Sequence, residues 1–112
     1  MVRTIGAALL LALALAPAAP ASAGTGPTKV KIANYAFSPA VLTVPVGTKV
    51  TWTDRDADAH NVTSTKGPTR FTSPTLTKGK SYSYTFHKIG TYRYVCTFHS
   101  NMHATVKVVA AR

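Results

Sequence analysis

The feature that most constrains the fold is an alternation of apolar and polar residues with a period of two, repeated in short runs along the chain. Successive side chains of a β-strand point to opposite faces, so each run predicts a strand with one buried face. Turn residues separate the runs, which are residues 29–32, 49–53, 81–86, 91–96 and 105–108. About seven short strands in so short a chain predict an all-β fold, an antiparallel sandwich or barrel with Greek-key connections.

The first 23 residues have the character of a secretory signal peptide. A basic residue precedes an apolar run over residues 5–15, which is shorter than the roughly 20 residues that span a bilayer, and a small-residue cleavage motif ends at Ala23. A permanent membrane anchor is the alternative, but no second apolar segment follows and two prolines would break a longer helix. We therefore expect an exported protein, periplasmic or extracellular, with one domain over residues 24–112.

Cysteine usage and charge constrain the function. Cys96 is the only cysteine, so no disulfide can form within the chain, and a domain this small is expected to depend on a metal or a well-closed sheet.

The chain has 13 Lys and Arg residues against 3 acidic residues, an excess that favours acidic proteins or anionic surfaces as partners of a monomer. Nucleic acid is disfavoured because the basic residues are spread singly. A basic surface that only aids solubility is the alternative.

The run over residues 91–96 places a cysteine at the edge of the predicted core. Alternation puts Tyr92, Tyr94 and Cys96 on one face, and the chain then leaves the sheet. Cys96, His99 and Met102 follow one another at intervals of three, and a loop of this length can turn a thiolate, an imidazole and a thioether onto one point. Taken singly they would be a buried hydrophobe, a surface histidine and a core filler. Together they suit copper, which accepts two imidazoles, a thiolate and a weak axial methionine.

The second imidazole of such a site has to come from elsewhere in the chain. His60 ends a polar loop at the start of an expected strand, from which its side chain can point into one end of a sandwich. His87 lies in a turn and faces away from the core by alternation with Phe86. His103 follows Met102 directly and points away from the site if Met102 points into it. His60 is therefore the expected partner of Cys96.

These segments resemble a known family. The matching pieces are residues 35–62, with a VGTKVTWTD segment before residues 60–62, and residues 82–102, with a Gly-Thr-Tyr-x-Tyr strand before the cysteine. On these pieces the chain resembles the cupredoxins, or type I (blue) copper proteins, over essentially its whole mature length. The spacing of the ligand loop is most similar to that of the amicyanins. The resemblance implies a cupredoxin-like Greek-key β-sandwich of about seven to eight strands. It also implies one type I copper ion, with the ligands His60, Cys96, His99 and Met102.

The resemblance further implies residues that hold the ligands in place. Asn61 matches an asparagine that ties the two ligand-bearing loops together in the family, here expected through Thr97. Phe98 stands where amicyanin-like loops usually have proline. Because proline has no N–H group, Phe98 can donate an additional backbone hydrogen bond to the Cys96 sulfur. Such a bond is expected to stabilise the reduced state and raise the reduction potential.

The expected function is one-electron transfer between redox proteins, without catalysis, because all four copper positions would be filled by the protein. The outer edge of His99 is the expected exit for the electron, in an uncharged docking patch of Phe98, His99 and Asn101. Basic residues at the rim are expected to steer an acidic partner; they include Arg55, Lys66 and Arg70. The three aspartates are expected to form a solvated loop; they are Asp54, Asp56 and Asp58.

Two other functions, and one other metal, are compatible with the sequence. A copper carrier or buffer would use the same ligands but exchange the metal rather than electrons. A metal-free sandwich would act as a binding module, with Cys96 merely buried. Zinc also accepts thiolate and imidazole ligands. The weak thioether ligand favours copper over zinc.

Overall fold

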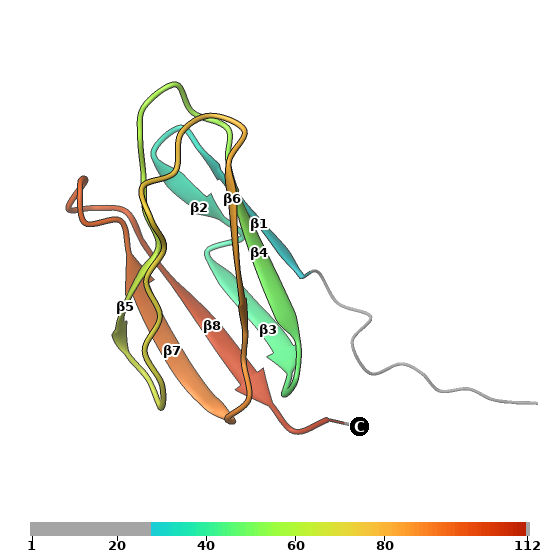
Figure 1. Cartoon of the computed structure of the whole chain (residues 1–112). Coiled ribbons are helices and arrows are strands. Elements are labelled where there is room, and N and C mark those ends of the chain that lie inside the picture. The colour runs from blue at the N-terminus through green and yellow to red at the C-terminus, as the bar shows by residue number, and fades with distance from the viewer. Residues whose placement is uncertain (1–27, 112) are drawn as a thin grey trace, which may run out of the picture.

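The strands predicted from the sequence are present, and they form two facing sheets (Figure 1). The computed structural model describes residues 28–111, and within them there are eight strands and no helix. The strands are β1 (Lys29–Ala33), β2 (Ala36–Ser38), β3 (Val41–Pro45), β4 (Lys49–Asp54), β5 (Thr63–Lys66), β6 (Ser81–Thr85), β7 (Gly90–Val95) and β8 (His103–Val109). One sheet has the order β2-β1-β4-β6 and the other the order β3-β8-β7-β5. The predicted all-β sandwich is thereby confirmed.

The signal peptide predicted for residues 1–23 lies outside the described residues. Residues 28–111 contain no helix that is long and apolar enough to cross a bilayer.

The strand pairing differs in part from the antiparallel arrangement expected. β1 pairs with β4 in parallel, with Val30 opposite Trp52, and β3 pairs with β8 in parallel, with Leu42 opposite Val106. The cause is the connectivity. After β2 the chain crosses to the second sheet as β3 and returns to the first sheet as β4, beside β1. Alternation decides which face of a strand is buried but carries no information on the direction of the neighbouring strand.

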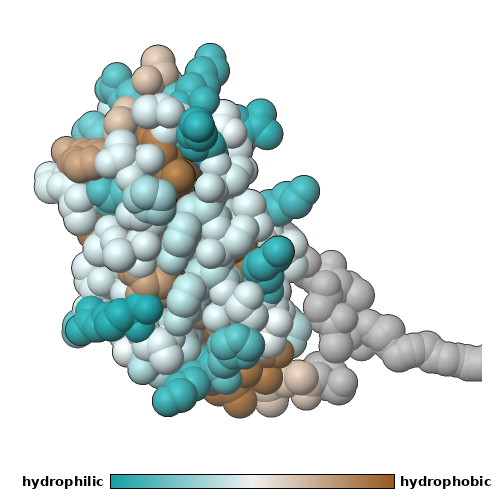
Figure 2. Space-filling model, in the orientation of Figure 1, coloured by the Kyte–Doolittle hydropathy of each residue, from teal (hydrophilic) through white to brown (hydrophobic). Residues whose placement is uncertain are grey.

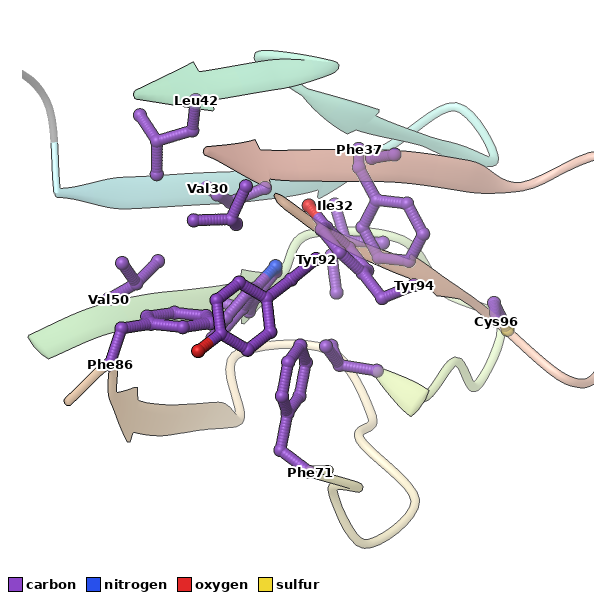
Figure 3. Packing of buried hydrophobic residues seen from close by; sticks show 14 of the residues in the cluster. Val30, Ile32, Phe37, Leu42, Val50, Phe71, Phe86, Tyr92, Tyr94 and Cys96 are labelled. Carbon is purple, nitrogen blue, oxygen red and sulfur yellow. The ribbon is translucent and has the colours of Figure 1, made fainter. Parts of the chain in front are cut away.

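Apolar side chains from both sheets fill the space between them, and aromatic rings occupy its centre (Figure 3). Trp52 of β4 is completely buried, and its ring contacts that of Tyr94 of β7 edge-on, with the centroids 5.5 Å apart. Burying a large apolar side chain contributes about 1.5–3 kcal/mol relative to leaving it exposed, so this cluster is the main source of stability. Cys96 belongs to the cluster and lies at one end of it, away from Val50 and Phe86 (Figure 3).

Three connections meet at the end of the sandwich where Cys96 lies (Figure 1). They are the turn between β1 and β2, the segment between β4 and β5, and the loop between β7 and β8. Hydrogen bonds join them: Asn34 N–H donates to Asp56 Oδ1 over 2.7 Å, and Asn61 Nδ2–H donates to Thr97 Oγ1 over 2.7 Å. Figure 2 shows hydrophobic residues beside hydrophilic ones at this upper end of the molecule. Segments far apart in the sequence thus share one end of the sandwich.

Candidate metal centre

Two imidazole nitrogens and one sulfur converge at this end of the sandwich. The donor atoms of His60, Cys96 and His99 all lie within 4.8 Å of one another. Cys96 Sγ is 3.7 Å from His60 Nδ1 and 3.6 Å from His99 Nδ1. His60 and Cys96 are fully buried, and His99 is half-buried. The three side chains come from two connections, one before β5 and one after β7.

The spacing of these atoms fits a bound metal ion. With metal–sulfur and metal–nitrogen bonds of about 2.3 and 2.0–2.1 Å, a sulfur–metal–nitrogen angle of about 109–120° places the two donor atoms roughly 3.5–3.8 Å apart. Both observed sulfur–nitrogen distances, 3.6 and 3.7 Å, lie at this separation. One ion can therefore contact all three atoms without a rearrangement of the two connections.

The loop between β7 and β8 is held by its own backbone. Cys96 N–H donates to Met102 O over 3.1 Å and closes the loop at its base. Within it, His99 N–H donates to Cys96 O over 3.4 Å and Met102 N–H donates to His99 O over 3.0 Å. Met102 is buried immediately before β8 begins, so its thioether is on the protein side of the loop. A soft sulfur donor beside two imidazoles and a thiolate is the set that copper accepts and that zinc sites seldom use.

His60 is fixed by both its backbone and its ring. Its backbone exchanges two hydrogen bonds with Leu76, with lengths of 2.9 and 2.7 Å, in an isolated bridge rather than in the strand expected from the sequence. Its Nε2 atom is 2.9 Å from Asp56 Oδ2. A carboxylate that accepts from Nε2–H fixes the tautomer and leaves Nδ1 free to bind a metal. His60 therefore presents its nitrogen to the site with little rotational freedom.

Asp56 was expected in a solvated loop, and that expectation is wrong. Its carboxylate accepts the N–H groups of Asn34 and Tyr35 over 2.7 and 2.9 Å, in addition to the bond from His60. The hydrogen bond from Tyr35 N–H, together with those from Asn34 and His60, lowers the pKa of Asp56 below its ordinary value. An ionised Asp56 thus links the turn between β1 and β2 to a buried histidine. The Asp56–His60 spacing of four residues was the only signal for it in the sequence.

The other two aspartates of this segment differ from each other. Asp54 is completely buried; its Oδ1 accepts from Asp56 N–H over 2.7 Å, while its Oδ2 has no hydrogen-bond partner within the described residues. Asp58 is exposed, as expected, and accepts the hydroxyl hydrogen of Tyr35. Alternation along β4 places Asp54 on the buried face of Val50 and Trp52, so the expectation of a solvated Asp54 is wrong although the pattern contained the signal.

Asn61 joins the two connections that carry the donor atoms. Its side chain donates to Thr97 Oγ1 over 2.7 Å and accepts from Thr97 N–H over 3.1 Å, so the expected link through Thr97 is present. Its Oδ1 also accepts from Thr63 Oγ1 over 2.9 Å. Its backbone N–H points at Cys96 Sγ over 3.4 Å. Asn61 therefore restrains the residues on both sides of the donor cluster.

The surroundings of His99 are more aromatic than expected. Phe98 is 51% exposed and Asn101 is exposed, as a docking patch requires. The sulfur accepts a backbone hydrogen bond from Asn61; none from Phe98 N–H is found within residues 28–111, and the role of Phe98 in tuning the sulfur stays a prediction. Tyr35, for which the sequence offered no signal, contacts the ring of His99, and its hydroxyl donates to Asp58. An aromatic residue from the turn between β1 and β2 therefore lies next to the expected patch.

The two remaining histidines lie outside the donor cluster. His87 and His103 are both exposed. His103 begins β8 with its side chain on the face opposite that of Met102, which is buried. Both positions agree with the orientation that alternation predicts.

The sequence of this chain is similar to those of cupredoxin-like proteins. The sequence model of a family described as "Cupredoxin-like domain" matches residues 5–108. Amicyanin-alpha of Methylorubrum extorquens is 38% identical over 86 residues, which are 74% of this chain and 72% of that protein. Amicyanin of Paracoccus denitrificans is also 38% identical over 86 residues, which are 74% of this chain and 66% of that protein.

Solved structures with the same fold include small proteins and part of an enzyme. A purple cupredoxin from Nitrosopumilus maritimus superimposes with a TM-score of 0.68 at 34% identity, covering 74% of this chain and all of that one. A copper-containing nitrite reductase from Thermus scotoductus gives a TM-score of 0.70 at 29% identity, covering 88% of this chain but only 25% of the enzyme.

Proposed function

This chain belongs to the cupredoxin family, and we propose that it carries single electrons with one type I copper ion held by His60, Cys96, His99 and Met102. The observation that supports this most is the convergence of Cys96 Sγ with two Nδ1 atoms at 3.6 and 3.7 Å. Copper in such a donor set alternates between Cu(I) and Cu(II), which is a one-electron change. The amicyanins and the purple cupredoxin to which the chain is similar support the same choice of metal.

The residues of the site favour electron transfer over catalysis. Asp56 restrains the ring of His60, and Asn61 restrains the segment that begins at Thr97. A donor set held from outside in this way changes little when the charge of the ion changes. Because the protein supplies all four donors, no position is left for a substrate, and we infer that the protein is not an enzyme. The nitrite reductase that shares the fold is four times as long as the segment that matches it.

The test of this function is the visible spectrum of the metal-free protein after addition of one equivalent of Cu(II). We expect an intense blue colour that one-electron reductants bleach and oxidants restore. A protein that stays colourless would be a zinc protein or a metal-free binding module. A protein that turns blue but releases its copper rapidly to a competing chelator would be a copper carrier or buffer.

We also infer that the protein is exported and that its mature form comprises residues 24–112. The apolar run and the cleavage motif within the first 23 residues support export. An unpaired thiol in an exported protein is open to oxidation unless it is protected, and the burial of Cys96 provides that protection. N-terminal sequencing of the protein recovered from outside the cytoplasm should begin near residue 24; an intact Met1 in that fraction would contradict the inference.

We infer that the partner is an acidic redox protein that approaches the exposed edge of His99. Phe98 and Asn101 provide accessible contact surface there, and Arg55, Lys66 and Arg70 are exposed. Opposite charges accelerate association, and dissolved salt screens them over about 10 Å at 0.1 M. The second-order rate of electron transfer should therefore fall as ionic strength rises. A rate that is indifferent to salt in stopped-flow measurements would exclude steering by these residues.

A further inference from the structure

Tyr35 covers both imidazoles of the donor cluster. It lies in the turn between β1 and β2 and is 49% exposed. Its ring centroid is 5.0 Å from that of His99 and 5.5 Å from that of His60, and both contacts are edge-on, with interplanar angles of 76° and 88°. The two imidazole rings are themselves 4.8 Å apart. One partly exposed aromatic ring therefore contacts both histidines.

The backbone of this turn adopts a conformation that a bulky residue rarely adopts. Asn34 and Tyr35 have φ angles of 53° and 57°, in the left-handed region. Such a conformation is costly for a tyrosine and persists only when the surroundings enforce it. The enforcing group is Asp56, whose carboxylate accepts the N–H groups of both residues. The same carboxylate accepts from His60, so the position of the Tyr35 ring is tied to that of the histidine beneath it.

The hydroxyl of Tyr35 is fixed as well. It donates to Asp58, which lies two residues before His60 in the same connection. The ring is thus held at its backbone by one aspartate and at its far end by another. An exposed tyrosine restrained at both ends is unusual, because exposed side chains ordinarily retain their rotational freedom.

His99 is the donor residue that most needs an external support. The Nε2 atom of His60 is held by Asp56, whereas the Nε2 atom of His99 has no hydrogen-bond partner within residues 28–111. The backbone N–H of His99 donates to Cys96 O over a long 3.4 Å. The orientation of its ring is therefore set by the groups that contact it: Cys96 Sγ, 3.6 Å from its Nδ1, and the rings of His60 at 4.8 Å, Tyr35 at 5.0 Å and Phe98 at 6.5 Å. Tyr35 is the closest of these rings that is not itself a proposed ligand.

We propose that Tyr35, locked by Asp58, is a positioning residue that holds the His99 ring in its ligating orientation. The role of Tyr35 toward copper rests on the proposed function. Its role in orienting His99 can be measured in the metal-free protein, since the contacts described involve protein atoms only.

The first experiment measures the ring of His99 in the metal-free protein by side-chain 15N and 13C NMR. We expect an ordered ring in the wild type, and a mobile ring with shifted resonances in Tyr35→Ala. In the copper-loaded protein, loss of two edge-on aromatic contacts should accelerate the transfer of copper to excess chelator about tenfold. It should also change the copper hyperfine splitting in the electron paramagnetic resonance spectrum, a change that a purely structural role would not produce.

Conservative variants separate the contribution of the Tyr35 ring from that of its hydrogen bond to Asp58. Tyr35→Phe keeps the ring and removes the hydroxyl, and Asp58→Ala removes the acceptor. Because both changes break the same hydrogen bond, each should give the same partial increase in ring mobility, and the double variant should add nothing. Ile89→Ala is the matched control: Ile89 is 57% exposed in the turn before β7, at the opposite end of that strand from Cys96, and its loss should leave His99 unchanged.

The outcomes are distinguishable. An unchanged His99 ring in Tyr35→Ala would overturn the proposal, and so would equal effects of Tyr35→Ala and Tyr35→Phe, since the ring contacts would then be irrelevant. If Tyr35→Ala does not fold, additive effects of Tyr35→Phe and Asp58→Ala would overturn the lock. If the wild type binds no copper while the ring of His99 responds as expected, the proposed function fails and the positioning role stands.

Discussion

The variant Cys96→Ser is expected to lose the blue colour of the copper-loaded protein completely, and to bind copper at least about 100-fold more weakly. Serine is close to cysteine in size but presents a hydroxyl that stays protonated at neutral pH, whereas the soft thiolate is both the strong ligand and the source of the colour. Cys96 is 1% exposed and contacts both Nδ1 atoms, so no other sulfur of this connection can replace it. Visible absorption and bound copper per chain are the measurements.

The neighbouring histidine supplies the control for that experiment. His103 is exposed and lies immediately after Met102, so His103→Ala removes an imidazole close to the loop without touching the donor cluster. We expect His103→Ala to keep both the colour and the affinity. A Cys96→Ser protein that remains blue, or a His103→Ala protein that does not, would show that the metal lies elsewhere.

The sequence predicts most of the framework of this site for a simple physical reason. The period of two in a strand decides which side chains are buried, and it placed Tyr92, Tyr94 and Cys96 inward and His103 outward, as found. Local spacing also brought His99 and Met102 onto the loop that Cys96 begins. These are properties of a single segment, and alternation carries them directly.

The features of the site that could not be predicted from the sequence depend on contacts between segments. Asp56 meets Asn34 and Tyr35 because the turn after β1 lies beside the segment after β4, and that proximity follows from the parallel pairing of β1 with β4. Alternation carries no information on this pairing, so the contact of Tyr35 with both imidazoles could not be foreseen. The link from Asn61 to Thr97 was expected only through resemblance to the cupredoxins, since nothing in its spacing requires it.

The parallel pair therefore contributes to function as well as to architecture. Tyr35 lies in the turn that follows β1, and His60 lies in the segment that follows β4. The carboxylate of Asp56 accepts hydrogen bonds from both residues and so joins the turn to the segment. One donor histidine is buried and held by a carboxylate, while the other is half-buried and held by aromatic rings. The more exposed histidine is thus the one whose edge a partner can reach.

Asn61→Ala is expected to lower the free energy of unfolding of the metal-free protein by about 3 kcal/mol, since each of its three side-chain hydrogen bonds contributes about 1 kcal/mol. Those bonds are two with Thr97 and one with Thr63, and Asn61 is only 7% exposed, so water cannot fully replace them. Urea denaturation followed by tryptophan fluorescence gives the measurement, because Trp52 is buried in the core next to these strands.

Two matched variants divide that effect into its parts. Thr63→Val and Thr97→Val each remove one hydroxyl that bonds to Asn61 while keeping the shape of the side chain, and each should cost about 1 kcal/mol. The bond from Thr97 N–H to Asn61 Oδ1 survives in both, so neither should loosen the connection after Cys96 as far as Asn61→Ala does. If Asn61→Ala cost no more than Thr97→Val, the backbone bond would contribute nothing. The bond to the Thr97 hydroxyl would then account for the whole contribution of Asn61 to the stability of the metal-free protein.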